Sequence, residues 1–151
     1  MNGNNTLSDL MQSEVKPFRP WLFEVEMIHT IINREVFDST LNLPKFKLLR
    51  KADIGNDFGW CEGEHDFETF KPESGQSLCT IGLLNSWKSV QSFVITLAHE
   101  MVHQWQWDIY SLERFKNKKS LILSHGPSFW QFRSTLANFS IPLKTTYPTD
   151  L

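Results

Sequence analysis

Hydrophobic and polar residues alternate along this chain with two different periods, which predict where helices and strands lie. Residues 1–16 are polar and rich in Asn and Ser, so we expect them to form a flexible N-terminus. Beyond Pro17 and Pro20, apolar residues recur every three or four positions, which predicts an amphipathic helix. The apolar positions of this helix are Trp21, Val25, Ile28, Ile32 and Val36. Asn42-Leu43-Pro44 closes the segment, because the residue before a proline avoids the helical region.

Three short extended segments follow the first helix. They are Phe46–Arg50, Phe58–Glu62 and Ser77–Leu84. Asp, Asn and Gly residues between the first two segments indicate a hairpin turn over Lys51–Asp57. Because the connections leave little room for crossover helices, we expect the three strands to form a small antiparallel sheet.

A long helix is predicted after the strands. Ser86 or Ser89 could cap its start, and its apolar pattern runs to about Asp108. Since the segment is apolar over much of its circumference, we expect a central and largely buried helix. Residues 111–120 are polar and basic, which indicates a linker between this helix and the next.

The last predicted element is a helix that begins at Pro127 and ends before Ile141-Pro142. Its apolar face carries Phe129, Phe132 and Leu136. Residues 142–151 are expected to form an irregular C-terminal tail. Together the elements predict an α+β domain over residues 17–141, in which the sheet packs against the first helix and the central helix.

The composition is that of a single compact domain. The chain has 151 residues, of which 40% are hydrophobic and 13% aromatic, a size typical of one domain. Its net charge of -2 supplies no general attraction to nucleic acid or to an anionic membrane. The N-terminus lacks the pattern of a secretory signal, and no apolar stretch is long enough to cross a membrane, so we expect a cytoplasmic monomer.

The two cysteines are interpreted as free thiols. Cys61 and Cys79 form neither a CxxC pair nor the dense framework of a disulfide-stabilised secreted domain. Both fall within predicted strands, where a small apolar side chain packs well. We therefore expect them to be buried strand residues, with a zinc or redox role as the alternative.

The reactive side chains are concentrated in His99-Glu100-Met101-Val102-His103, an HExxH sequence inside the central helix. Residues four apart share one face of an α-helix and lie about 6 Å apart along its axis, so two imidazoles at this spacing can bind one metal ion. Glu100 follows the first histidine and can reach a water molecule bound to the metal. Such a short motif also arises by chance, but these polar residues are costly in an apolar helix unless they have partners. We predict that His99 and His103 are metal ligands.

A catalytic zinc site usually has three protein ligands and an open position for water. The remaining histidines of the chain are His29, His65 and His125. His125 precedes Gly126 and Pro127 at the start of the final helix, whose apolar face should return to the core. We interpret His29, beside the apolar stripe of the first helix, as a structural histidine, and His65 as part of a solvated acidic loop. His125 is therefore the candidate third ligand.

Beyond the histidines, the chain carries four short blocks in a definite order. They are Asn33–Phe37 before Leu43-Pro44, then Gly59-Trp60-Cys61, then Leu97–Gln104, and then His125–Phe129. In this order, over roughly residues 18–140, they resemble the SprT-like (Spartan-type) zinc metallopeptidases. The resemblance implies a zincin-like fold, with two zinc ligands and the catalytic glutamate in the HExxH block and the third ligand at His125.

The resemblance implies a zinc-dependent endopeptidase with one Zn²⁺ per chain and a protein or peptide substrate. In this reaction zinc polarises the scissile carbonyl and lowers the pKa of its bound water, while Glu100 takes the water proton and passes it to the leaving amine. Two alternatives are a zinc-containing DNA- or protein-binding module without proteolytic activity, and an interaction protein with a vestigial site. The presence of Glu100 argues against both, because neither needs this carboxylate.

SprT-like proteases act on proteins bound or crosslinked to DNA, so the resemblance also implies DNA as a partner. The matching feature is a basic segment that includes the aromatic residue Phe115. The basic residues are Arg114, Lys116, Lys118 and Lys119. Four positive charges near an aromatic ring could bind phosphate and stack a base. The alternative is a solvated linker, and the chain also lacks the CxxC pairs of the zinc ribbon that family members often carry.

Overall fold

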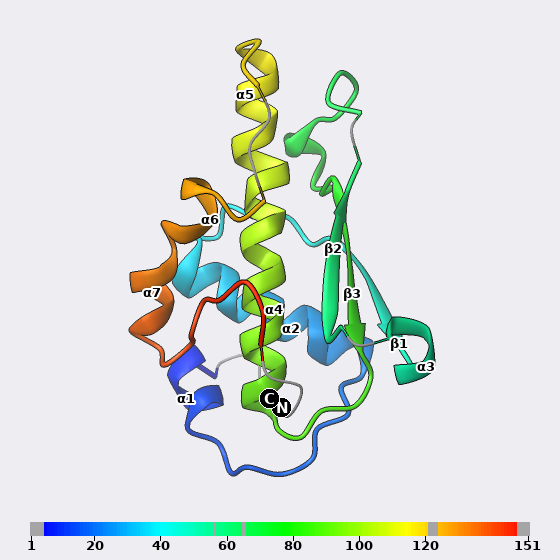
Figure 1. Cartoon of the computed structure of the whole chain (residues 1–151), viewed down its shortest axis with the longest axis vertical. Helices are drawn as coiled ribbons and strands as arrows, with labels where there is room; N and C mark the ends of the chain where they lie inside the picture. Colours follow the sequence, from blue (N-terminus) through cyan, green and yellow to red (C-terminus); the bar gives the residue numbers. More distant parts are fainter. Residues whose placement is uncertain (1–4, 56, 65, 121–123, 148–151) are drawn as a thin grey trace.

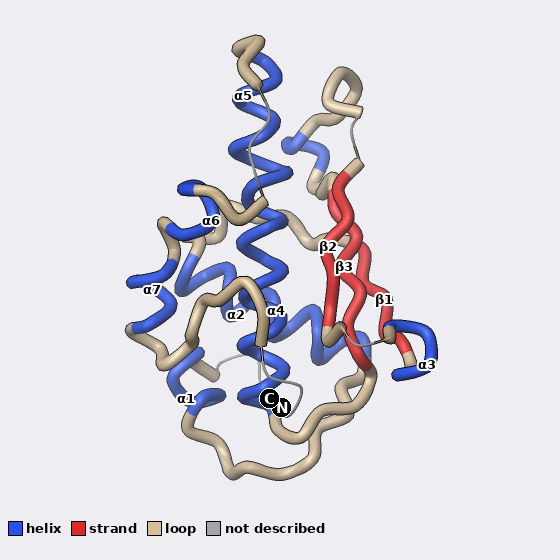
Figure 2. Tube along the Cα trace, viewed as in Figure 1, coloured by secondary structure: helices blue, strands red, loops and turns tan. Residues whose placement is uncertain are grey.

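The computed structural model describes residues 5–55, 57–64, 66–120 and 124–147. The predicted α+β class is confirmed, with one long helix, α4 (Val90–Trp105), at its centre. A three-stranded sheet packs along one side of α4, and α2 (Leu22–Val36) packs against both α4 and the sheet (Figure 1, Figure 2). The sheet therefore packs against α2 and the central helix, as expected.

Helix α2 forms where its apolar stripe predicts it. Val25, Ile28 and Ile32 are fully buried in the core. Trp21, which we expected on the same face, instead precedes the helix in an extended conformation and is 71% exposed. Its backbone N–H donates to Glu24 Oε1 at 3.1 Å, so this pair defines the start of the helix after Trp21.

Part of the segment that we expected to be a flexible N-terminus is a helix, α1 (Leu7–Met11). Thr6 starts this helix with a capping box: its Oγ1 accepts from the Asp9 N–H at 3.1 Å, and its N–H donates to Asp9 Oδ2 at 3.0 Å. Leu7 and Leu10 are buried where α1 packs against α2 and α4. The prediction was wrong for these residues because two leucines on one face dock the short helix, although the surrounding sequence is polar.

The sheet is mixed, which corrects the predicted antiparallel arrangement. β1 (Lys45–Leu49) pairs in parallel with β3 (Cys79–Leu84), and β2 (Gly59–Gly63) pairs antiparallel with β3, so the strand order is β1-β3-β2. The predicted hairpin is also wrong, because Lys51–Ile54 forms a short helix, α3, and the first two strands lie on opposite sides of β3. All residues of β3 except Thr80 are buried, which suits a central strand.

The edge strand β2 is held close to the central helix. Gly63, at the end of β2, lets the indole of Trp107 approach so closely that a Cβ at this position would overlap the ring. Between β2 and β3 the chain forms a short 3-10 helix, η1 (Pro72–Ser74). The contact between Gly63 and Trp107 therefore fixes one end of β2 against the helix that continues from the HExxH motif.

The central helix does not end near Asp108 as predicted. It continues through a π-helical segment, η2 (Gln106–Ser111), into α5 (Leu112–Lys116), so the first half of the expected basic linker is helical. Buried Asp108 accepts hydrogen bonds from the Leu78 N–H at 2.8 Å and the Ser77 hydroxyl at 2.6 Å. These bonds tie the extended helix to the start of β3. Neither this helix nor any other in the described part of the chain is long and apolar enough to cross a membrane.

The predicted C-terminal helix is divided into α6 (Pro127–Trp130) and α7 (Arg133–Ala137). Phe129 and Leu136 are fully buried, as their spacing predicted. Residues 142–147, the last that the structure describes, contain no helix or strand. They nevertheless pack on the domain, because Leu143 is buried and the Tyr147 ring lies 5.5 Å from that of His99.

Candidate metal centre

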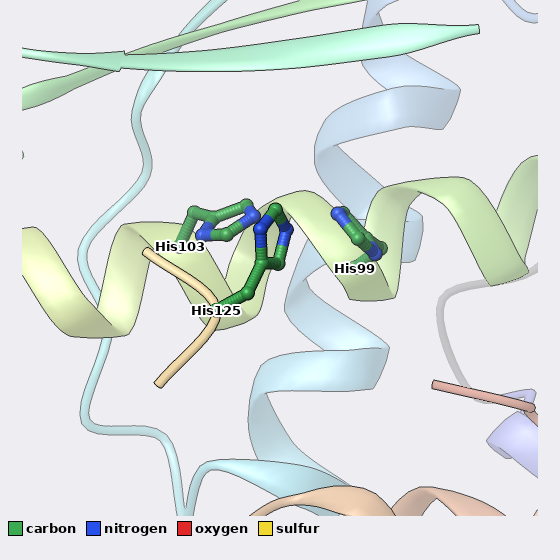
Figure 3. A group of neighbouring side chains, drawn as sticks. All are labelled: His99, His103 and His125. Atoms are coloured by element: carbon green, nitrogen blue, oxygen red, sulfur yellow. The ribbon is translucent and has the colours of Figure 1, made fainter. Parts of the chain in front are cut away.

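Three histidines meet on one side of α4. His99 and His103 come from successive turns of the helix, and His125 comes from the loop before α6; one nitrogen of each ring lies within 4.8 Å of the others (Figure 3). The ring centroids of His103 lie 5.0 Å from those of both His99 and His125. No other group of three His, Cys, Asp or Glu side chains among the described residues is close enough together to hold a metal ion.

The apolar residues of α4 determine which way the helix-borne histidines face. The residues beside them in the helix are fully buried: Leu97, Ala98, Met101 and Val102. These side chains fix the rotation of α4 about its axis, so His99 and His103 lie together on the face that borders the cavity.

Phe129 forms the floor beneath the three rings. Its ring centroid lies 5.2 Å from that of His99, 5.1 Å from that of His103 and 4.8 Å from that of His125. The next residue, Trp130, donates from Nε1 to the carbonyl of His125 at 3.0 Å. Packing of α6 on the core thus brings a histidine from an exposed loop to the pair on α4.

A glutamine orients His103. Nδ1 of His103 lies 2.7 Å from Oε1 of Gln106. Nε2 of Gln106 donates to the carbonyl of Ser124 and to the hydroxyl of Ser128, both at 3.0 Å. Gln106 was not singled out from the sequence, although it lies three residues after His103 and therefore on the same helical face.

His99 and His103 are held in the neutral form that a metal ligand needs. Burial, together with the neighbouring His103 and His125, lowers the pKa of His99 to about 3. The pKa of His103 is also lowered, mainly by burial. Nδ1 of His99 is buried and has no hydrogen-bond partner within the described part of the chain. Two neutral imidazoles, one of which has a buried nitrogen left unpaired, fit a metal ion, which would bind lone pairs that the protein does not use.

Glu100 lies beside the histidines in a cavity of about 580 Å³ between α4 and β2. The residue is only 6% exposed, and burial, with a smaller contribution from Asp57, raises the pKa of its carboxyl to about 8. A carboxyl that gains and loses a proton near neutral pH is suited to exchange protons with a water molecule in the cavity.

His29 and the two cysteines are not part of this histidine cluster. His29 is 1% exposed and its Nε2 lies 2.8 Å from Oε1 of Gln104, so it is a structural histidine as predicted. His65 lies outside the described residues. Cys61 and Cys79 are free thiols on β2 and β3, as predicted, although Cys61 is only half-buried and borders the cavity.

The basic segment lies at the far end of the extended helix, beyond the position of α6 (Figure 1). Its lysines are exposed: Lys116, Lys118 and Lys119. The guanidinium of Arg114 is 5.7 Å from the ring centroid of Tyr110 and donates to the carbonyl of Ser120. Phe115, which we expected to be available for a base, is stacked on Phe67 with centroids 5.0 Å apart. The aromatic residue of this segment therefore already has a partner within the protein.

Comparison with known proteins adds no family assignment to this geometry. No protein-family model matches the chain, and no curated protein matches its sequence. The chemistry of the site is therefore inferred from its own residues.

Proposed function

We propose that this protein is a zinc-dependent endopeptidase of the SprT-like type, with a zincin-like fold. The observation that carries the proposal is the meeting of His99, His103 and His125 beside Glu100. Imidazole ligands suit zinc, and a set of three leaves a fourth tetrahedral position for water, whereas a structural zinc site is usually closed by four protein ligands. The resemblance of the four sequence blocks to SprT-like metallopeptidases supports the same assignment.

The proposed mechanism gives each residue of the site a role. The three histidines would hold the ion, which would polarise the scissile carbonyl and lower the pKa of a bound water. Glu100 takes a proton from the attacking water and later gives it to the leaving amine. Its burial favours the protonated form, so the carboxyl can hold this proton between the two transfers.

The substrate is proposed to be an extended protein segment. β2 is an edge strand of the sheet and borders the cavity through Gly59, Trp60 and Cys61. Backbone groups on such an edge can pair with an added strand, which would carry a peptide across the cavity beside the histidines. DNA-associated proteins are the proposed substrate class, on the resemblance and on the exposed lysines of the basic segment.

The first test separates metal binding from cleavage. We expect about one zinc per purified chain by elemental analysis, and we expect His125→Ala to lose it while the control His65→Ala retains it. Glu100→Gln should keep the zinc but reduce cleavage of an unfolded protein substrate to background, because an amide cannot accept the water proton. Undiminished cleavage by Glu100→Gln, or full zinc occupancy in His125→Ala, would overturn the assigned roles.

A further inference from the structure

One glutamine joins the two halves of the histidine cluster. Gln106 is 4% exposed and lies where α4 gives way to the π-helical η2. From this position its amide forms hydrogen bonds with His103 on the helix and with Ser124 and Ser128 around the loop that carries His125. A buried side chain that connects the elements supplying the histidines is placed to control their relative geometry.

The direction of each hydrogen bond follows from the chemistry of the partner. The carbonyl of Ser124 can only accept, so the amide nitrogen of Gln106 faces it. The amide oxygen then faces Nδ1 of His103 at 2.7 Å and can only accept. His103 must therefore carry its proton on Nδ1, which leaves the lone pair of Nε2 free for a metal ion.

The use of an amide also has an electrostatic consequence. A carboxylate in this position would add negative charge beside the ligands and make the imidazole more basic. A glutamine orients the ring without charge, and its amide does not titrate with pH. The positive charge of a bound metal is then less compensated, which preserves its ability to polarise a substrate carbonyl.

The same side chain secures the loop of the third histidine. His125 is exposed, and Ser124 immediately precedes it, while Ser128 lies in the first turn of α6. The two bonds from Gln106 Nε2 bracket His125 on both sides in the sequence. They add to the ring contact of Phe129 with His125 and to the hydrogen bond from Trp130 to the His125 carbonyl.

We propose that Gln106 is a positioning residue of the metal centre: it fixes His103 in the Nδ1–H tautomer and holds the His125 loop against α4. The proposal rests on the function proposed above, since it assumes that the three histidines bind a metal ion. It extends that function by assigning to one neutral side chain both the orientation of one ligand and the placement of another.

The tautomer is tested in the unmodified protein. Long-range ¹H–¹⁵N NMR correlations of the zinc-free protein, in which no metal dictates the tautomer, distinguish a histidine protonated on Nδ1 from one protonated on Nε2. We expect the Nδ1–H form for His103, with its proton shifted by the hydrogen bond to Gln106. Protonation of His103 on Nε2 would overturn the proposal, and this result does not depend on whether any variant folds.

The loop contact is tested by substitution. Gln106→Leu removes all three hydrogen bonds at similar volume, and we expect zinc affinity, measured by chelator competition, to fall about 10–100-fold. Gln106→Glu keeps an acceptor for His103 but has no amide donor for Ser124. Its zinc affinity should therefore fall by less than that of Gln106→Leu. Gln131→Leu is the control, because the exposed Gln131 donates to the Ser128 carbonyl at 2.9 Å and does not line the cavity of the histidines, and its zinc affinity should equal that of the parent.

The outcomes separate this proposal from the proposed function. If the parent protein binds no zinc, the proposed function fails. If the parent binds zinc and cleaves protein but Gln106→Leu binds zinc with unchanged affinity, only the role of Gln106 fails. The proposal is supported if Gln106→Leu loses zinc affinity as expected while Gln131→Leu keeps the affinity of the parent.

Discussion

His29 is expected to make the stability of the protein depend on pH. The residue is 1% exposed, and its ring stands edge-on to Phe46. Gln104 donates from Nε2 to the Asn42 carbonyl, so its Oε1 faces His29 and accepts the proton of His29 Nε2 at 2.8 Å. Burial lowers the pKa of His29 from 6.5 to about 4, and the hydrogen bond to Gln104 opposes this shift only in part.

The sign of the effect follows from proton binding in the two states. The unfolded chain protonates His29 below about pH 6.5, but the folded protein does so only below about pH 4. Between these values the unfolded state binds more protons, so the free energy of unfolding falls as the solution is acidified. For one group with these two pKa values, the loss relative to neutral pH is about 1 kcal/mol at pH 5.5 and about 2–3 kcal/mol at pH 4.5.

The test compares the parent with His29→Leu. The variant cannot titrate at this position, but it leaves Oε1 of Gln104 unpaired, which should cost about 1–3 kcal/mol at neutral pH. Urea unfolding followed by tryptophan fluorescence, with EDTA present throughout, should show the parent more stable at pH 7.5. The free energy of unfolding of the parent, relative to that of the variant, should be lower by about 2–3 kcal/mol at pH 4.5. A difference that is the same at both pH values would refute the burial of a neutral imidazole at this site.

Two further predictions concern the floor of the metal centre and the basic segment. Phe129→Ala is expected to lower the free energy of unfolding by about 3–5 kcal/mol in EDTA. It is also expected to weaken zinc binding in chelator competition, and an unchanged zinc affinity would limit the role of Phe129 to core packing. Replacing Lys116, Lys118 and Lys119 by Gln is expected to weaken binding of single-stranded DNA at low salt without changing zinc content, because released counterions drive such binding. Equal fluorescence anisotropy titrations of variant and parent would exclude this segment as the DNA contact.

The helices were largely predictable because their apolar residues repeat at short range. In α2, Val25, Ile28 and Ile32 lie on one face by spacing alone, and all three are buried. The persistence of the central helix beyond Asp108 was not predictable in this way. It depends on hydrogen bonds that Asp108 accepts from Ser77 and Leu78, some thirty positions earlier in the chain, which no local pattern reports.

The order of the strands was missed although the sequence contained a signal for it. We expected neighbouring strands in the chain to be neighbours in the sheet, which led to an antiparallel sheet and a hairpin. β3 is apolar on both faces, through residues such as Ile81, Leu83 and Leu84, whereas Lys47 and Glu62 interrupt β1 and β2. A strand buried on both faces belongs in the middle of a sheet, so hydrophobicity would have been a better guide than chain order.

At the N-terminal helix, a local capping signal was a better guide to the structure than the polar composition. Thr6 and Asp9 have the spacing of a capping box, followed by Leu10 on the same face as Leu7. The many Asn and Ser residues around them led us to expect a flexible segment. In the structure the two leucines are buried, the cap is formed, and the Leu7 N–H also donates to Glu35, so the short helix docks on the larger core.

The three histidines differ in how far local geometry determines their positions. His99 and His103 are placed together by one helix, so their proximity follows from spacing alone. His125 comes from a distant loop, and its position depends on Phe129 packing beneath the rings and on Gln106 bonding to both sides of the loop. Gln106 shares a helical face with His103, which the sequence reveals, but its serine partners could be found only once α6 was placed. The affinity of the site for metal should therefore be most sensitive to the contacts that hold this loop.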